Sequence, residues 1–153
     1  MGTQAFTIKA NGLISRIRTP VSIRQSLEFC RTFNLRSEQI DVVALWDTGA
    51  SLSSISQGLA AKLGLSKVDR ETVAGFGGYQ IANIDIVDIL LPNQVVIPNV
   101  RVAEFIDNGK FDVIVGMDII TLGDFSITNH DGLSVVSFRM PPGDRHTDYV
   151  AET

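Results

Sequence analysis

The chain has 153 residues, with 17 acidic and 13 basic side chains and a formal net charge of −4. This length suits one domain and is too short for two cores of ordinary size. Hydrophobic residues make up 44% of the chain and charged residues 20%, which is typical of a folded globule, and an acidic chain without a basic stripe is a poor nucleic-acid binder.

The first forty residues are mainly of strand type. Residues 5–23 predict a hairpin that turns at the Asn-Gly dipeptide at 11–12, a pair typical of tight turns. Residues 24–39 lack period-2 alternation, and Ser26 can cap a short helix within them. We therefore expect residues 1–39 to form an N-terminal hairpin and insertion packed on the rest of the domain, and we assign no function to them.

A compact apolar strand leads directly into the motif that begins at Asp47. Residues 41–46 (DVVALW) predict a buried strand, and residues 47–51 (DTGAS) follow it directly. A short helix is expected next because Ile55, Leu59 and Leu63 share one helical face. Ser53 or Ser54 is the expected cap of this helix.

The middle of the chain predicts four more strands. Residues 68–90 predict a long hairpin with a glycine-rich tip, and imperfect alternation along its second arm indicates a bulge. Residues 94–97 and 100–105 predict two short strands separated at Pro98-Asn99.

The C-terminal part continues this pattern. Residues 111–115 predict a strand, and residues 117–122 predict about one and a half helical turns. Residues 125–138 predict a last hairpin, and residues 140–153 predict a flexible polar tail. Many short strands with minor helices predict an all-β fold.

Few residues are available for cofactor chemistry. Cys30 is the only cysteine, which excludes an internal disulfide, and His130 and His146 are too few and too badly spaced for a zinc site. No stretch approaches the roughly 20 apolar residues that span a bilayer, and the N-terminus lacks the pattern of a signal peptide. We therefore expect a cytoplasmic protein that uses no metal or other cofactor and binds neither nucleic acid nor membrane.

The tripeptide Asp47-Thr48-Gly49 points to chemistry. The buried strand before it would aim the carboxylate, Gly49 allows backbone N–H groups to approach the acid, and the Thr48 hydroxyl can bond to a neighbouring backbone. A simple Asx or Ser/Thr turn at the end of a strand is the alternative interpretation of the same residues.

Three elements resemble the retropepsin-like aspartic proteases, a group of single-domain dimeric enzymes, and they follow one another along the chain in the right order, with the flap between the two motifs. Residues 46–51 (WDTGAS) resemble the active-site signature. Residues 113–116, which end in Val115 and Gly116, resemble the second motif of this superfamily. The hairpin tip resembles the flap of retroviral proteases, with Gly75, Phe76, Gly77 and Gly78.

The resemblance covers about residues 40–139, which we take as the retropepsin-like aspartic protease domain. The run GMDIITLGDFSIT is more similar to retroviral-type aspartyl proteases of bacteria and to the related domain of eukaryotic DNA-damage-inducible proteins than to the viral enzymes. The sequence departs from the viral pattern at Ser51 and Met117, which stand where retroviral enzymes carry an acidic residue and a paired arginine.

The resemblance implies a closed all-β acid-protease barrel with a flap hairpin and one or two short helices. It implies an aspartic endopeptidase, and because the chain carries one Asp-Thr-Gly, Asp47 would meet its copy in a homodimer. Thr48, Gly49 and Ala50 would support the active site, and an extended peptide or protein substrate would lie beneath the flap. The implied subsite residues are Leu52, Ser54, Phe111 and Ile114.

Two points stay open at this stage. A non-catalytic dimeric peptide-binding module of the same fold is the alternative function, although its acid, Asp47, would then have no need to be intact. The hairpin 126–138 is the candidate for an intersubunit sheet, because its apolar arm 133–138 would otherwise be an exposed edge.

Asp85 and Asp88, on the second arm of the long hairpin, are expected to be solvated charges.

Overall fold

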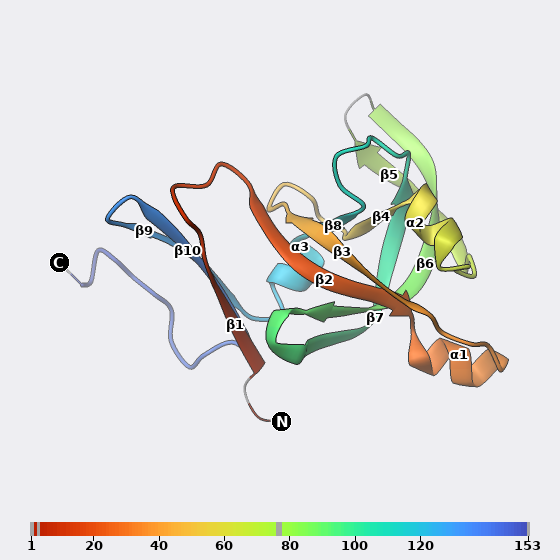
Figure 1. The fold of residues 1–153 in the computed structure, drawn as a ribbon, viewed down its shortest axis with the longest axis horizontal. Helices are drawn as coiled ribbons and strands as arrows, with labels where there is room; N and C mark the ends of the chain where they lie inside the picture. The colour runs from red at the N-terminus through yellow and green to blue at the C-terminus, as the bar shows by residue number, and fades with distance from the viewer. Residues whose placement is uncertain (1, 3, 76–77, 153) are drawn as a thin grey trace.

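The computed structural model describes residues 2, 4–75 and 78–152 (Figure 1). The described strands are β1 (Gln4–Lys9), β2 (Ile17–Gln25), β3 (Gln39–Trp46), β4 (Ser54–Ser56), β5 (Asp69–Gly75), β6 (Gly78–Leu91), β7 (Val95–Phe105), β8 (Val113–Val115), β9 (Asp124–His130) and β10 (Leu133–Met140). The helices in the same residues are α1 (Leu27–Phe33), α2 (Gln57–Lys62) and α3 (Met117–Ile120), with one 3-10 turn, η1 (Pro92–Gln94).

The strands form a closed barrel and a separate small sheet. The larger sheet has the order β2-β3-β8-β4-β7-β6-β5, and β2 also pairs with β6, so six strands close into a ring with β5 attached outside. The smaller sheet has the order β1-β10-β9 and lies to one side of the barrel (Figure 1). The predicted closed all-β barrel is confirmed, with three short α-helices in the described residues where one or two were expected.

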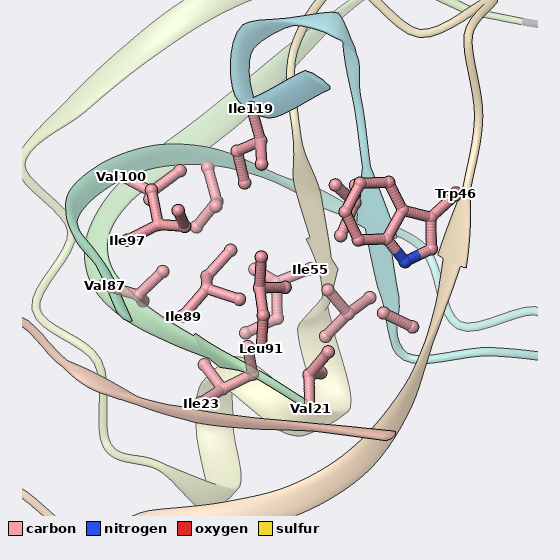
Figure 2. Packing of buried hydrophobic residues seen from close by; sticks show 14 of the residues in the cluster. Val21, Ile23, Trp46, Ile55, Val87, Ile89, Leu91, Ile97, Val100 and Ile119 are labelled. Atoms are coloured by element: carbon pink, nitrogen blue, oxygen red, sulfur yellow. The ribbon is translucent and has the colours of Figure 1, made fainter. Parts of the chain in front are cut away.

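The barrel interior holds the main hydrophobic core. Figure 2 shows aliphatic side chains from β2, β4, β6 and β7 pointing toward one another, with Ile119 of α3 closing one side. Most of these side chains come from alternate strand positions, since successive residues of a strand face opposite sides of the sheet, and the irregular register of β6 and β7 lets both Ile97 and Val100 face inward. The labelled members of this core are Val21, Ile23, Trp46, Ile55, Val87, Ile89, Leu91, Ile97, Val100 and Ile119.

Trp46, the last residue of β3, joins the small sheet to the barrel. Its side chain is 4% exposed, and its indole Nε1–H donates to Oγ1 of buried Thr19 at 2.8 Å. Its ring centroid lies 5.8 Å from that of Phe6, 5.1 Å from that of Phe125 and 5.6 Å from that of Phe138. Because Asp47 follows Trp46 directly, this aromatic contact also anchors the strand that carries the candidate catalytic acid.

The predicted N-terminal hairpin is wrong in its pairing, although both strands form. β1 pairs with β10, where Phe6 lies opposite Phe138, whereas β2 pairs with β3 and β6. The physical reason is the burial of Phe6 against Trp46 and Phe138, which are distant in sequence and which a local turn signal does not report. As a result, β2 is a strand of the barrel itself rather than part of an element packed on it.

The reason for expecting an intersubunit sheet at the hairpin 126–138, an arm 133–138 that is otherwise an exposed edge, does not hold. These residues belong to β10, which lies between β1 and β9 and pairs with both. Deleting the residues after Asn129 would therefore remove the central strand of the small sheet together with buried Phe138. Such a truncation would test folding rather than dimerisation.

The two strands expected around Pro98-Asn99 are one continuous strand, β7. The register of β6 and β7 shifts between Val87 and Ile89, which confirms the bulge predicted in this arm. Asn99 adopts a positive φ of 57°, a conformation that asparagine tolerates better than most residues, and its N–H donates to Asp88 Oδ1 at 3.1 Å. A carboxylate at the bulge therefore allows β7 to continue past the proline.

Asp85 and Asp88 are buried, which overturns the expectation that they are solvated. Their residues are 0% and 3% exposed. Asp88 accepts the N–H of Leu27 at 3.2 Å and forms an ion pair with Arg24 at 3.1 Å. Asp88 thus ties the start of α1 to the barrel, which gives residues 24–39 a structural role.

The short helices form near their expected positions. α1 begins after Ser26, whose Oγ accepts the N–H of Phe29 at 3.2 Å, so the predicted cap is confirmed. The cap of α2 is Ser56 rather than Ser53 or Ser54, because Ile55 continues the chain as strand β4. Among the described residues, no helix has the length and apolar character needed to cross a membrane.

Candidate active site

Asp47 lies in a tight turn at the end of β3. Its backbone N–H donates to the carbonyl of Val115 at 2.9 Å, and its carboxylate Oδ1 accepts the N–H of Gly49 at 2.8 Å. A Cβ atom at Gly49 would lie 3.1 Å from the same Oδ1, so glycine leaves room for the carboxylate to approach the backbone. The half-buried residue is thus held at its carboxylate by the backbone of its own turn and at its backbone N–H by β8.

The second motif lies against the Asp47 turn. Val115 pairs with Trp46 in the parallel β3–β8 ladder, and the N–H of Met117 donates to the carbonyl of Ala50 at 2.8 Å. A Cβ atom at Gly116 would lie 2.8 Å from that carbonyl oxygen and 2.9 Å from the carbonyl carbon of Leu52. Glycine at 116 therefore lets the two motifs pack backbone to backbone.

Ser53 and Asp118 form a buried link between the motifs that the sequence analysis missed. Ser53 is 0% exposed. Its Oγ donates to Asp118 Oδ1 at 2.7 Å, and its N–H donates to Asp118 Oδ2 at 3.0 Å. The same Oγ accepts the N–H of Gly116 at 3.0 Å. The sequence shows only that a polar residue follows shortly after each motif. It does not indicate that Ser53 and Asp118 contact each other, which depends on the fold.

Replacing Ser53 by Ala is expected to lower the free energy of unfolding by about 2 kcal/mol, because it leaves Gly116 N–H without its acceptor and Asp118 without one donor. Urea denaturation followed by fluorescence would measure the change. The matched control is Ser51→Ala, since Ser51 is exposed in the same loop. Equal losses in the two variants would contradict this role for Ser53.

Three of the four expected subsite residues lie close to the two motifs in the fold. Ser54 of β4 pairs with Ile114 of β8, and both are half-buried. Leu52 is half-buried and packs against the small cluster of Ala82, Ile84 and Ala103 at the base of the β5–β6 hairpin. The fourth residue, Phe111, precedes β8, and its ring lies 6.0 Å from that of Phe105.

The long hairpin forms as predicted, from β5 and β6. Gly75 pairs with Gly78 at its outer end. Phe76 and Gly77, the other two residues of the expected flap tip, lie outside the described residues. Figure 1 shows the hairpin at the top right of the molecule, extending away from the small sheet.

Two hollows border the Asp47 turn. A cavity of about 480 Å³ is lined by Asp47, Trp46, residues 14–17 and Ile127 of β9, among others. A larger one, of about 860 Å³, is lined by Thr48, α3, β10 and residues 145–147. Within residues 2, 4–75 and 78–152, no group of three or more His, Cys, Asp and Glu side chains is arranged to hold a metal ion.

The chain matches a known protein family. Residues 34–121, more than half of the chain, match the family described as "gag-polyprotein putative aspartyl protease". No curated protein sequence matches the chain.

Two solved structures resemble the fold. A retropepsin-like aspartic protease from Rickettsia conorii is 12% identical, with a TM-score of 0.54 over 91% of this chain and 96% of the other. EIAV protease, solved in complex with the inhibitor HBY-793, is 21% identical, with a TM-score of 0.50 over 72% of this chain and 90% of the other. At these identities, the comparison establishes a retropepsin-like fold.

Proposed function

Because the chain belongs to this gag-polyprotein aspartyl protease family, we propose that it is an aspartic endopeptidase whose active site is assembled from two copies of the chain. The observation that carries the proposal is the Asp47 turn itself. Its carboxylate follows a barrel strand, accepts the N–H of Gly49, and belongs to a loop that hydrogen-bonds to the second motif. This arrangement gives the acid a rigid position.

The need for two copies follows from the chemistry. Hydrolysis by carboxylates alone needs one ionised and one neutral acid close together, and two like charges in contact favour sharing one proton. The sequence contains one Asp-Thr-Gly. A symmetric dimer would bring Asp47 and its copy together across the two-fold axis, and the pair would titrate as a unit.

The proposed reaction uses a water molecule between the two Asp47 carboxyl groups. The ionised carboxylate takes a proton from water as the water oxygen bonds to the peptide carbonyl carbon, while the neutral carboxyl group donates its proton to the carbonyl oxygen. The tetrahedral intermediate then breaks its C–N bond: the leaving nitrogen takes the proton from the carboxyl group that had accepted it from water, and the other carboxylate takes a hydroxyl proton from the intermediate as the new carboxylic acid forms, which restores one ionised and one neutral acid. No other reactant is required.

The residues around Asp47 would position the partner and the substrate. Thr48, which borders the larger cavity, would bond to the loop of the partner copy. The β5–β6 hairpin would act as the flap over an extended peptide that binds as an added strand. Leu52, Ser54, Phe111 and Ile114 would line side-chain subsites, and their apolar or small character favours apolar residues beside the cleaved bond.

A stoichiometric inhibitor titration tests this proposal. A statine-type peptide imitates the tetrahedral intermediate and would bind the paired carboxyl groups more tightly than a substrate does. We expect cleavage of a peptide pool to stop at one inhibitor molecule per two chains. We also expect the specific activity to fall on dilution as dimers dissociate. Tight peptide binding without cleavage at any pH would favour the non-catalytic binding module instead.

A further inference from the structure

The β5–β6 hairpin leaves the barrel at one residue, Ile84. This residue pairs both with Asp69 of β5 and with Ala103 of β7. From Ile84 toward the tip, the described residues of β6 pair with β5 alone, whereas from Ile84 toward Leu91 they pair with β7. The junction between the barrel and the hairpin therefore lies at Ile84, and Asp85 is its next neighbour on the barrel side.

Asp85 is buried at this junction without a hydrogen-bond donor. It is 0% exposed, and neither carboxylate oxygen has a hydrogen-bond partner among the described residues. It faces the same side of the β6–β7 pair as Val87 and Val102, because alternate residues of a strand share a face. An ionised carboxylate is costly in such a place.

Glu104 of β7, which is 6% exposed, holds both arms of the hairpin at their base. Its Oε1 forms an ion pair with Nζ of Lys67 at 3.0 Å, two residues before β5 begins. Its Oε2 accepts the side-chain N–H of Asn83 on β6 at 2.9 Å. Asn83 in turn accepts a hydrogen bond from Arg70 of β5 at 3.3 Å. One barrel carboxylate thus connects the two hairpin arms to β7.

We propose that Asp85 and Glu104 form a proton-sharing pair that anchors the base of the hairpin when Asp85 is protonated and loosens it when Asp85 ionises. A protonated Asp85 donates to Glu104 and adds a third contact to this carboxylate. An ionised Asp85 instead places a second negative charge beside it, away from water. The proposal concerns the hairpin and holds whether or not the protein cleaves peptides.

The surrounding charges determine the direction of the switch. Burial and the nearby Glu104 carboxylate raise the pKa of Asp85 to about 7, against a smaller opposing effect of Lys67. Burial acts to raise the pKa of Glu104 too, but hydrogen bonds from Asn83 and Lys67, and one from Asp85 when Asp85 is protonated, hold it below its usual value.

Arg70 lies on the same face as Asn83, to which it donates, and the acidic residues of β5 lie on the opposite face. Arg101 pairs there with Asp69 and Glu71 of β5, and all three are well exposed. By strand alternation, Arg101 and Glu104 point to opposite sides of β7. Among the described residues, Glu104 and Lys67 are therefore the charged groups that act on Asp85 from the neighbouring elements.

The raised pKa has a defined consequence for stability. The folded protein holds the Asp85 proton more tightly than the unfolded chain does, so the stabilisation is complete below about pH 4. It is lost progressively as the pH rises toward about 7, the pKa in the folded protein. Above that pH no further loss is expected from this group.

Carboxyl ¹³C NMR and amide hydrogen exchange of the full chain test the proposal directly. We expect the Asp85 carboxyl group to titrate near pH 7 in the wild-type protein. We expect amides of residues 79–83, after correction for intrinsic exchange, to lose about ten-fold or more in protection between pH 5.5 and pH 8.5, as one pKa unit corresponds to a ten-fold change. Neither measurement depends on activity.

The variant Asp85→Asn should remove this pH dependence, and Asp85→Leu provides a second non-titrating variant if the first folds poorly. Asp131→Asn is the matched control, because Asp131 is exposed in the β9–β10 turn. A carboxyl titration of Asp85 near pH 4 would overturn the proposal. An unchanged pH dependence of exchange in either folded Asp85 variant would do so as well.

Discussion

Peptide cleavage by the Asp47→Asn variant is expected to fall by about 10³-fold or more, with the fold intact. The amide has nearly the shape of the carboxyl group, and its oxygen can still accept the N–H of Gly49 that now binds Oδ1. It can neither take a proton from water nor share one with the partner copy. Initial rates on a peptide pool, with circular dichroism to verify folding, would measure the effect.

The matched control is Asp107→Asn, which changes an exposed aspartate that accepts the N–H of Gly58 at the start of α2, outside the two motifs. This control should keep its rate near that of the wild-type protein. Mixing excess Asp47→Asn chains with wild-type chains should also suppress activity, because each mixed dimer would hold only one Asp47 carboxyl group instead of two. Undiminished cleavage by pure Asp47→Asn protein would exclude Asp47 as the catalyst.

The largest effect on stability is expected from Trp46→Ala, about 3–5 kcal/mol of unfolding free energy. The substitution removes a buried indole, its hydrogen bond to Thr19, and the ring contacts to Phe6, Phe125 and Phe138. These contacts join the small sheet to the barrel. The small sheet should therefore lose hydrogen-exchange protection, in addition to the decrease in the free energy of unfolding of the whole protein. Chemical denaturation followed by circular dichroism would measure it.

Two variants separate packing from hydrogen bonding in this cluster. Trp46→Phe should retain most of the ring contacts and lose only the donor to Thr19, for a smaller cost of about 1–2 kcal/mol. Phe33→Ala is the surface control, since Phe33 is 59% exposed on α1. Similar losses for Trp46→Ala and Phe33→Ala would show that Trp46 does not join the two sheets.

Local sequence patterns were reliable where the structure depends on neighbouring residues. Alternation and turn residues located most strands, and Ser26 correctly predicted the start of α1. The bulge in β6 was also visible as broken alternation. Pairing is not visible in the same way. The Asn-Gly signal is local and predicts that β1 pairs with β2, whereas the partner of β1 lies about 130 residues away.

The same distinction between local features and long-range contacts applies to the candidate site. The position of Asp47 after a buried strand, the glycine beside it and the second apolar-Gly motif were determined by the sequence alone, because each depends on a few consecutive residues. The Ser53–Asp118 link and the burial of Asp85 beside Glu104 were decided only by the tertiary structure. From sequence alone, an aspartate or glutamate is expected to be exposed to water. Only the strands packed around the carboxylate determine whether water reaches it and whether it keeps its proton.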